Sequence, residues 1–182
     1  MNIADTQREI RYAFLGGFAG QYVSSLIWLI AASLKTWLST RAGISALFLG
    51  SMGIFPFNQM LVRLLGCSGM VSPENKLWGL GPQIAFTVPI NFLLVGAATL
   101  FRVTWFFPAA KFVVGSHYLP FIILYGMNIF GILASVMVVI GAGLVLYGPH
   151  IFTLGVWLTG IRLIVFGFVG GKIVLNEEMG EQ

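Results

Sequence analysis

The sequence predicts an all-α fold, a polytopic transmembrane helix bundle of about six spanning helices joined by short loops. Three observations predict this class. Of the 182 residues, 58% are hydrophobic and only 9% are charged, whereas soluble domains carry roughly a quarter charged residues. Six apolar stretches approach the roughly 20 residues that a helix needs to cross a bilayer. Glycine, which lets membrane helices approach closely, occurs 23 times.

The predicted spans are separated by short polar or charged connections, and together they form a single membrane domain over residues 1–182. They cover residues 12–34, 43–62, 82–101, 105–127, 129–147 and 149–171. The fourth and fifth spans are divided near Asn128, because about 40 apolar residues exceed one span even when tilted. Residues 172–182 are expected to form a flexible acidic tail.

Basic residues near the span ends predict the orientation, since cytoplasmic loops carry an excess of Lys and Arg. Six spans place both termini on one side of the membrane. The cations expected on that side are Arg8, Arg11, Arg63, Lys76 and Lys172. Those expected on the other side are Lys35, Arg41 and Arg102, with Lys111 one turn inside. The excess predicts a multi-pass protein with both termini in the cytoplasm.

Arg162 lies near the middle of the sixth predicted span. A charge at that depth costs from about 2.5 to more than 10 kcal/mol, so we expect its side chain to face the bundle interior. Every Asp and Glu lies outside the predicted spans. Two interpretations of Arg162 remain open. It either locks the bundle through hydrogen bonds to neutral groups, or it binds an anionic solute or a lipid headgroup.

Neutral polar side chains occur at similar depths in the other spans, and we take them with Arg162 as candidate binding residues. The full candidate set is Gln21, Asn58, Gln59, Thr87, Asn91, His117, Thr159 and Arg162. We expect Arg162 to contact Asn91, His117 and Gln21 in particular. Polar groups of this kind can also serve only to hold helices together.

Prolines interrupt three of the predicted spans, at Pro56, Pro89 and Pro120. A proline inside a helix frees the carbonyl four residues earlier, because it has no N–H to donate. The freed carbonyls would be those of Met52, Ala85 and Ser116. In hydrocarbon such groups need another donor.

The sequence lacks the motifs of a catalytic or metal centre. It contains no His-Glu-x-x-His pattern, no glycine-rich nucleotide loop and no pair of carboxylates within the spans. Cys67 is the only cysteine, and His117 and His150 are the only histidines. The basic residues are scattered rather than gathered in a stripe that follows phosphates. We therefore expect no catalytic residues, no metal, no cofactor and no nucleic-acid partner.

The run Trp105-Phe106-Phe107-Pro108, continued by His117-Tyr118-Leu119-Pro120-Phe121 and Leu124-Tyr125-Gly126-Met127, resembles a family of small bacterial integral membrane proteins of unknown function. The resemblance covers mainly the fourth predicted span. It implies a polytopic fold in the bacterial plasma or inner membrane and assigns no role to any residue.

Two function classes fit these features. The first is a small transporter or channel-like protein for an anionic solute. The alternative is a non-transporting subunit or sensor that assembles with a membrane partner or with further copies of itself. A membrane enzyme comes third. A water-accessible path to Arg162 favours the first class, and a dry, fully packed interior favours the second.

Overall fold

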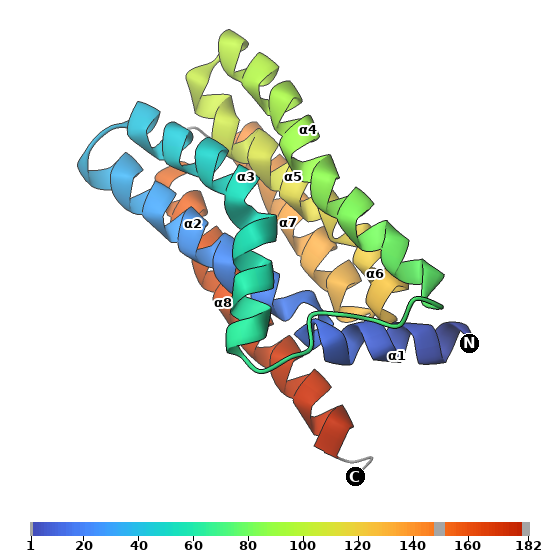
Figure 1. Ribbon diagram of the computed structural model, residues 1–182. Coiled ribbons are helices and arrows are strands. Elements are labelled where there is room, and N and C mark those ends of the chain that lie inside the picture. Colours follow the sequence, from blue (N-terminus) through green and yellow to red (C-terminus); the bar gives the residue numbers. More distant parts are fainter. Residues whose placement is uncertain (1, 148–151, 180–182) are drawn as a thin grey trace.

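The computed structural model describes residues 2–147 and 152–179, and within these ranges the chain is helical with no strand. The bundle is shown in Figure 1. Its α-helices are α1 (Ile3–Ala13), α2 (Phe18–Trp37), α3 (Thr40–Leu64), α4 (Leu80–Phe101), α5 (Phe106–His117), α6 (Leu119–Tyr125), α7 (Ile129–Tyr147) and α8 (Phe152–Met179). Short 3₁₀ turns at Leu15–Gly17, Lys76–Gly79 and Val103–Trp105 precede α2, α4 and α5.

Six helical segments of the described chain are long and apolar enough to cross a membrane, which confirms the predicted fold class. They are Leu15–Trp37, Thr40–Leu64, Lys76–Phe101, Val103–Tyr125, Ile129–Leu146 and Phe152–Glu177. The protein is therefore a multi-pass membrane protein. The residues 149–151 with which the sixth predicted span begins lie outside the described residues.

Helix α1 is not part of the first span, although the sequence predicted that span to begin at residue 12. Asn2 caps α1 by accepting a 2.9 Å hydrogen bond from the Asp5 amide, and the helix buries Thr6, Ile10 and Ala13 along one face. The chain then takes positive φ angles at Leu15, Gly16 and Gly17, a conformation that glycine adopts without strain. Because of this break, α1 lies across one end of the bundle (Figure 1), hereafter the α1 end; the opposite end, where α2 meets α3, is the Ser39 end.

The fourth predicted span is two helices rather than one. Helix α5 ends at His117, α6 begins at Leu119, and Tyr118 lies between them. Pro120 therefore falls in the first turn of α6, where its missing N–H breaks no helical hydrogen bond. Pro56 and Pro89 do lie inside helices, in α3 and α4, and Figure 1 shows α3 bending along its length.

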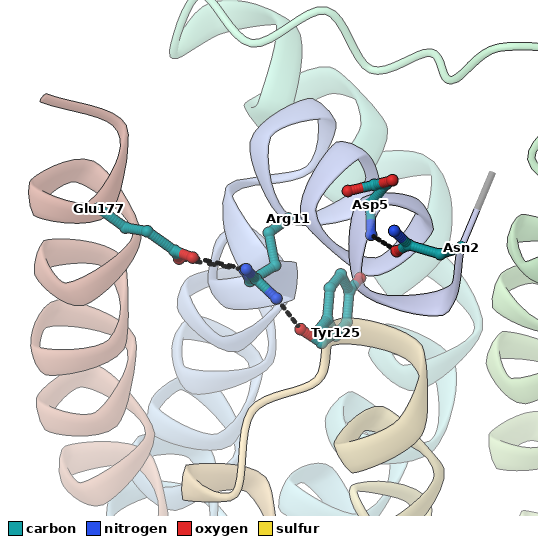
Figure 2. Close-up of polar contacts among 5 residues, drawn as sticks. All are labelled: Asn2, Asp5, Arg11, Tyr125 and Glu177. Carbon is teal, nitrogen blue, oxygen red and sulfur yellow. Dashed lines mark hydrogen bonds and ion pairs between the residues drawn. The ribbon is translucent and has the colours of Figure 1, made fainter. Parts of the chain in front are cut away.

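Helix α8 continues as far as Met179, so residues 172–179 of the segment expected to be a flexible tail are helical. An ion pair holds this end of α8. Arg11 donates to both carboxylate oxygens of Glu177, at 3.1 and 2.6 Å, and to the Tyr125 carbonyl at 2.8 Å. Figure 2 shows Arg11 between Glu177 and Tyr125. Arg11 thus ties α1 to the ends of α6 and α8. Residues 180–182 lie outside the described residues.

Close packing joins α2 to α8 through glycines of α8. A Cβ atom on Gly160 would lie 2.7 Å from Leu29, and one on Gly170 would overlap the Phe18 ring. Ser25 of α2 adds a 2.9 Å hydrogen bond to the Gly160 carbonyl. Small residues allow such backbone approach in membranes, where the hydrophobic effect does not drive helices together.

At the α1 end, Glu9 holds the long connection between α3 and α4. Its carboxylate accepts hydrogen bonds from the Ser72 amide at 2.6 Å and from the Asn75 side chain at 2.6 Å. These bonds, the one to the Ser72 amide first, lower the pKa of Glu9 below its ordinary value of 4.5. The connection is thereby fastened to α1 by a charged acceptor.

We predict that this fastening weakens in acid. A group whose pKa is lower in the folded than in the unfolded state stabilises the fold above the unfolded pKa, and loses that effect as the pH falls through the folded pKa. Thermal unfolding of the purified protein should therefore shift to lower temperature below about pH 4.5. Glu9→Gln should remove part of this pH dependence. Equal pH dependence in both proteins would contradict the assignment.

The topology gives a second prediction. Figure 1 places the N- and C-terminal ends of the described chain at the same end of the bundle. From the excess of cations at that end, we predict that Met179 and Asn75 face the cytoplasm and that Ser39 faces the opposite side. Reporters active on one side only, fused after each of these residues, check the orientation. Activity of the Ser39 and Met179 fusions on the same side would refute it.

Candidate functional site

A cavity of about 130 Å³ lies between α2, α3, α4 and the junction of α5 with α6. Aromatic side chains form much of its wall. They include Phe55 of α3, Phe86 of α4, and Tyr118, Phe121 and Tyr125 from the junction. Tyr118, Phe121 and Tyr125 pack against one another and against Phe130 of α7. The aromatic residues around the break at Tyr118 thus line the same cavity.

The polar part of the cavity comes from α2 and α3. The Gln21 side chain is 1% exposed, and neither its Nε2 nor its Oε1 atom has a hydrogen-bond partner. The buried Oδ1 atom of Asn58 also has none. Ser24, in contrast, is hydrogen-bonded to Tyr118. An unsatisfied buried polar group costs about 1–3 kcal/mol, so the two amides form an incomplete network that faces the cavity.

His117 joins this site from α5 and is held by α4. Its Nδ1 atom lies 3.2 Å from the Thr87 hydroxyl, and that hydroxyl donates to the Ile84 carbonyl at 2.7 Å. The ring is also hydrogen-bonded to the Ile84 backbone. The imidazole therefore has a defined orientation at the cavity wall.

Two residues that line the cavity have backbone carbonyls that lose their helical hydrogen bond to a proline. Pro56 and Pro89 lie inside α3 and α4, and each lacks the N–H that would bond the carbonyl four residues earlier. Those carbonyls belong to Met52 and Ala85, and both residues line the cavity. The third proline-freed carbonyl expected from sequence, that of Ser116, does not arise, because Pro120 starts a new helix.

A second polar group lies nearer the Ser39 end and centres on Lys111 of α5. The Lys111 side chain is 1% exposed, and its Nζ atom has no hydrogen-bond partner. Arg162 of α8 and Lys35 of α2 are near enough to act on it electrostatically. Lys111 packs against glycines: a Cβ atom on Gly155 would lie 3.0 Å from Nζ, and one on Gly141 would lie 3.5 Å from the lysine Cβ. Three basic side chains, from α2, α5 and α8, thus interact electrostatically.

The structure divides the candidate residues between these two places. Gln21, Asn58 and His117 line the cavity, and Thr87 touches it through His117. Arg162 belongs to the Lys111 group, and Thr159, on the same face of α8 as Gly155, donates to the Gly155 carbonyl at 2.8 Å. Asn91 and Gln59 do not line the cavity.

The sequence did not bring out Lys111 as a site residue, and of the three contacts expected for Arg162 the one with Gln21 is not made. Gln21 does not hold Arg162, since both of its amide atoms lack partners, and His117 is bonded to Thr87. A lysine one turn inside a span ordinarily reaches back to the headgroups. Only the packing of α5 against α7 and α8 shows that Lys111 points inward. The glycines at positions 141 and 155, which leave room for a long side chain, were the sequence feature that could have indicated this.

The fold defines a polytopic all-α membrane protein, with two buried polar groups and a cavity of about 130 Å³ in its interior. The chain belongs to a family of unknown function, DUF7010, whose model matches residues 3–170. No curated protein and no solved structure matches it.

We predict that the glycine break before α2 is needed for the shape of the cavity. Gly17 has a φ of 79°, and a Cβ atom there would lie 2.7 Å from the Tyr125 ring. Gly17→Ala should therefore destabilise the protein by more than the ~1–2 kcal/mol of a left-handed alanine alone. Thermal or denaturant unfolding measures the loss.

Gly66→Ala is the matched control for this prediction. Gly66 has a φ of 81°, but a Cβ atom there meets nothing within 4 Å. Gly66→Ala places an alanine in a left-handed conformation but creates no steric clash, so its loss of stability should be smaller. Equal losses in the two variants would show that the contact with Tyr125 does not matter.

Proposed function

We propose that this membrane protein is a small transporter or channel-like protein for an anionic solute, and that the solute binds beside Lys111 and Arg162. The observation that supports the proposal is the Lys111 amino group, which is buried without a hydrogen-bond partner and within electrostatic range of Arg162 and Lys35. Burying a charge costs several kcal/mol unless it is paired. An anion is the species that relieves all three cations together.

The distribution of charge along the bundle supports the same assignment. The carboxylates whose side chains the structure describes, those of Asp5, Glu9, Glu74 and Glu177, belong to α1, to the connection between α3 and α4, and to the end of α8. All of these segments lie at the α1 end. The carboxylates therefore leave the Lys111 group without a fixed counter-ion. A cluster of one charge sign between low-dielectric walls attracts ions of the opposite sign.

Lys111 lies close to the Ser39 end of the bundle. Lys111 is the sixth residue of α5, which places it about 7.5 Å from the start of that helix at 1.5 Å per residue. Gly155 lies in the first turn of α8, where the helix dipole adds partial positive charge. Arg41 and Arg102, at the ends of α3 and α4 on the same side, extend the positive field toward the water.

Uptake by proteoliposomes tests the proposal. The probes are radiolabelled chloride, inorganic phosphate and acetate, presented to vesicles of neutral phosphatidylcholine that contain the purified protein. We expect uptake of at least one of them above that of protein-free vesicles. Lys111→Met should reduce it by about tenfold or more, which corresponds to a loss of about 1.4 kcal/mol of binding. Arg162→Met should also reduce it.

Two further variants make the result specific. Arg162→Lys retains the charge but loses the planar fork, so it should restore part of the uptake lost in Arg162→Met. Lys172→Met is the matched control, because Lys172 lies on α8 toward the α1 end, over the Phe168 ring at 4.5 Å; it should leave uptake unchanged. Uptake of none of the three anions, or full uptake by Lys111→Met, would instead favour the non-transporting subunit.

Vesicles with and without anionic phosphatidylglycerol separate a free solute from a lipid headgroup. If the three cations receive a headgroup, the anionic lipid should compete with uptake or replace it as the bound species. If they receive a dissolved anion, uptake should persist in neutral lipid alone.

A further inference from the structure

The cavity at Gln21 and Asn58 is separate from the Lys111 group and differs from it in chemistry. None of the residues that line it is Lys, Arg, Asp or Glu. Its polar atoms are amide, hydroxyl, imidazole and backbone groups. A charged ligand would be left there without a counter-charge, so the occupant that suits this lining is uncharged.

The cavity opens toward the bilayer rather than toward water. The lining side chains that are exposed on the surface are Met52 and Phe55 of α3 and Phe86 of α4, at 48%, 37% and 64% exposure. All three lie well inside the spans Thr40–Leu64 and Lys76–Phe101. The opening is therefore between α3 and α4 at the level of the hydrocarbon. A ligand that uses it arrives dissolved in the lipid.

The size and walls of the cavity specify the part of the ligand that enters. Its volume of about 130 Å³ is close to the ~150 Å³ of an engineered apolar cavity that binds benzene. Aromatic rings from α3, α4 and the junction of α5 with α6 surround it, and rings pack well against other rings. One ring-sized group fits, with any alkyl chain left between α3 and α4.

The unpartnered atoms specify what that ring carries. Gln21 offers a donor at Nε2 and an acceptor at Oε1, and Asn58 offers an acceptor at Oδ1. A hydroxyl group both donates and accepts, so one hydroxyl can accept from Gln21 and donate to Asn58. A hydrocarbon ring satisfies neither amide.

We propose that this cavity is a binding site for a lipid-dissolved, uncharged amphiphile whose ring-sized head bears a hydroxyl group, admitted from the bilayer between α3 and α4. Gln21 and Asn58 bind the hydroxyl, and the aromatic wall holds the ring. This proposal does not depend on the charge of the Lys111 group or on the ligand proposed there. Experiments can therefore support or refute the two sites independently.

The test uses a matched pair of probes on the full chain in nanodiscs. Radiolabelled 4-decylphenol carries the hydroxyl, and decylbenzene is the same molecule without it. We expect saturable binding of 4-decylphenol that unlabelled decylbenzene displaces at least about tenfold less well, the effect of one good hydrogen-bonded contact. Equal competition by the two compounds, or no saturable binding, would overturn the proposal.

Variants then locate the site. Gln21→Leu removes an amide that has no partner, so the folded protein should unfold at the same or a higher temperature while affinity for 4-decylphenol falls about tenfold or more. Asn91→Leu is the control, an amide of α4 that does not line the cavity, and it should leave the affinity unchanged. Unchanged affinity in Gln21→Leu would overturn the proposal.

A filling variant covers the case in which Gln21→Leu fails to fold. Ala85 lines the cavity from α4, so Ala85→Phe should occupy the space of the ring and abolish saturable binding. Retained binding in Ala85→Phe would place the ligand elsewhere and would overturn the proposal on its own. Anion uptake by either variant should be unaffected.

Discussion

The close contact between α2 and α8 is the interaction on which the rest of the structure depends. Glycines of α8 receive Phe18, Tyr22 and Leu29 from α2, and the Ser25 hydroxyl bonds the Gly160 carbonyl. In a bilayer such contact has to come from packing and hydrogen bonds, because lipid tails are as apolar as the side chains. The span Leu15–Trp37, which contains α2, is the most buried of the six, with 67% of its apolar stretch buried inside the protein.

A central α2 explains why polar residues of this helix are removed from both water and lipid. One side of the helix places Ser25 against α8, and another places Gln21 and Ser24 at the cavity bounded by α3 and the α5–α6 junction. Its last turn carries Lys35, whose Nζ atom lies 4.7 Å from the centre of the Phe107 ring on α5. The same helix therefore contributes to both buried polar groups.

Charge is separated along the bundle, and this separation gives the two ends different properties. At the α1 end, carboxylates have partners within the protein: Glu177 pairs with Arg11, and Glu9 binds Ser72 and Asn75. These contacts fasten α1, the long connection and α8 to one another. Toward the Ser39 end, the buried Lys111 has like charges as its electrostatic neighbours. One end is thus internally neutralised, and the other retains a positive field.

The sequence by itself determined the class of the protein. Composition and the lengths of the apolar stretches are local properties, and they establish six membrane-spanning helices because a bilayer admits few other solutions. The same reasoning located a charge in the last span and polar residues in the others. It placed Gln21, Asn58 and His117 at compatible depths, since depth along a helix follows from residue count.

Only the tertiary structure decided which polar residues meet. Depth leaves the rotation of each helix and the choice of neighbours open, and these depend on how the side chains of several helices pack. Arg162 therefore acts electrostatically on Lys111 and makes no hydrogen bond to Gln21. The pattern of apolar residues also could not predict the helix breaks at Leu15–Gly17 and Tyr118. Hydropathy does not distinguish a continuous helix from two helices that meet inside the membrane. The break at Tyr118 lies beside three aromatic residues that line the cavity, Tyr118, Phe121 and Tyr125. The shape of the cavity therefore depends on this break.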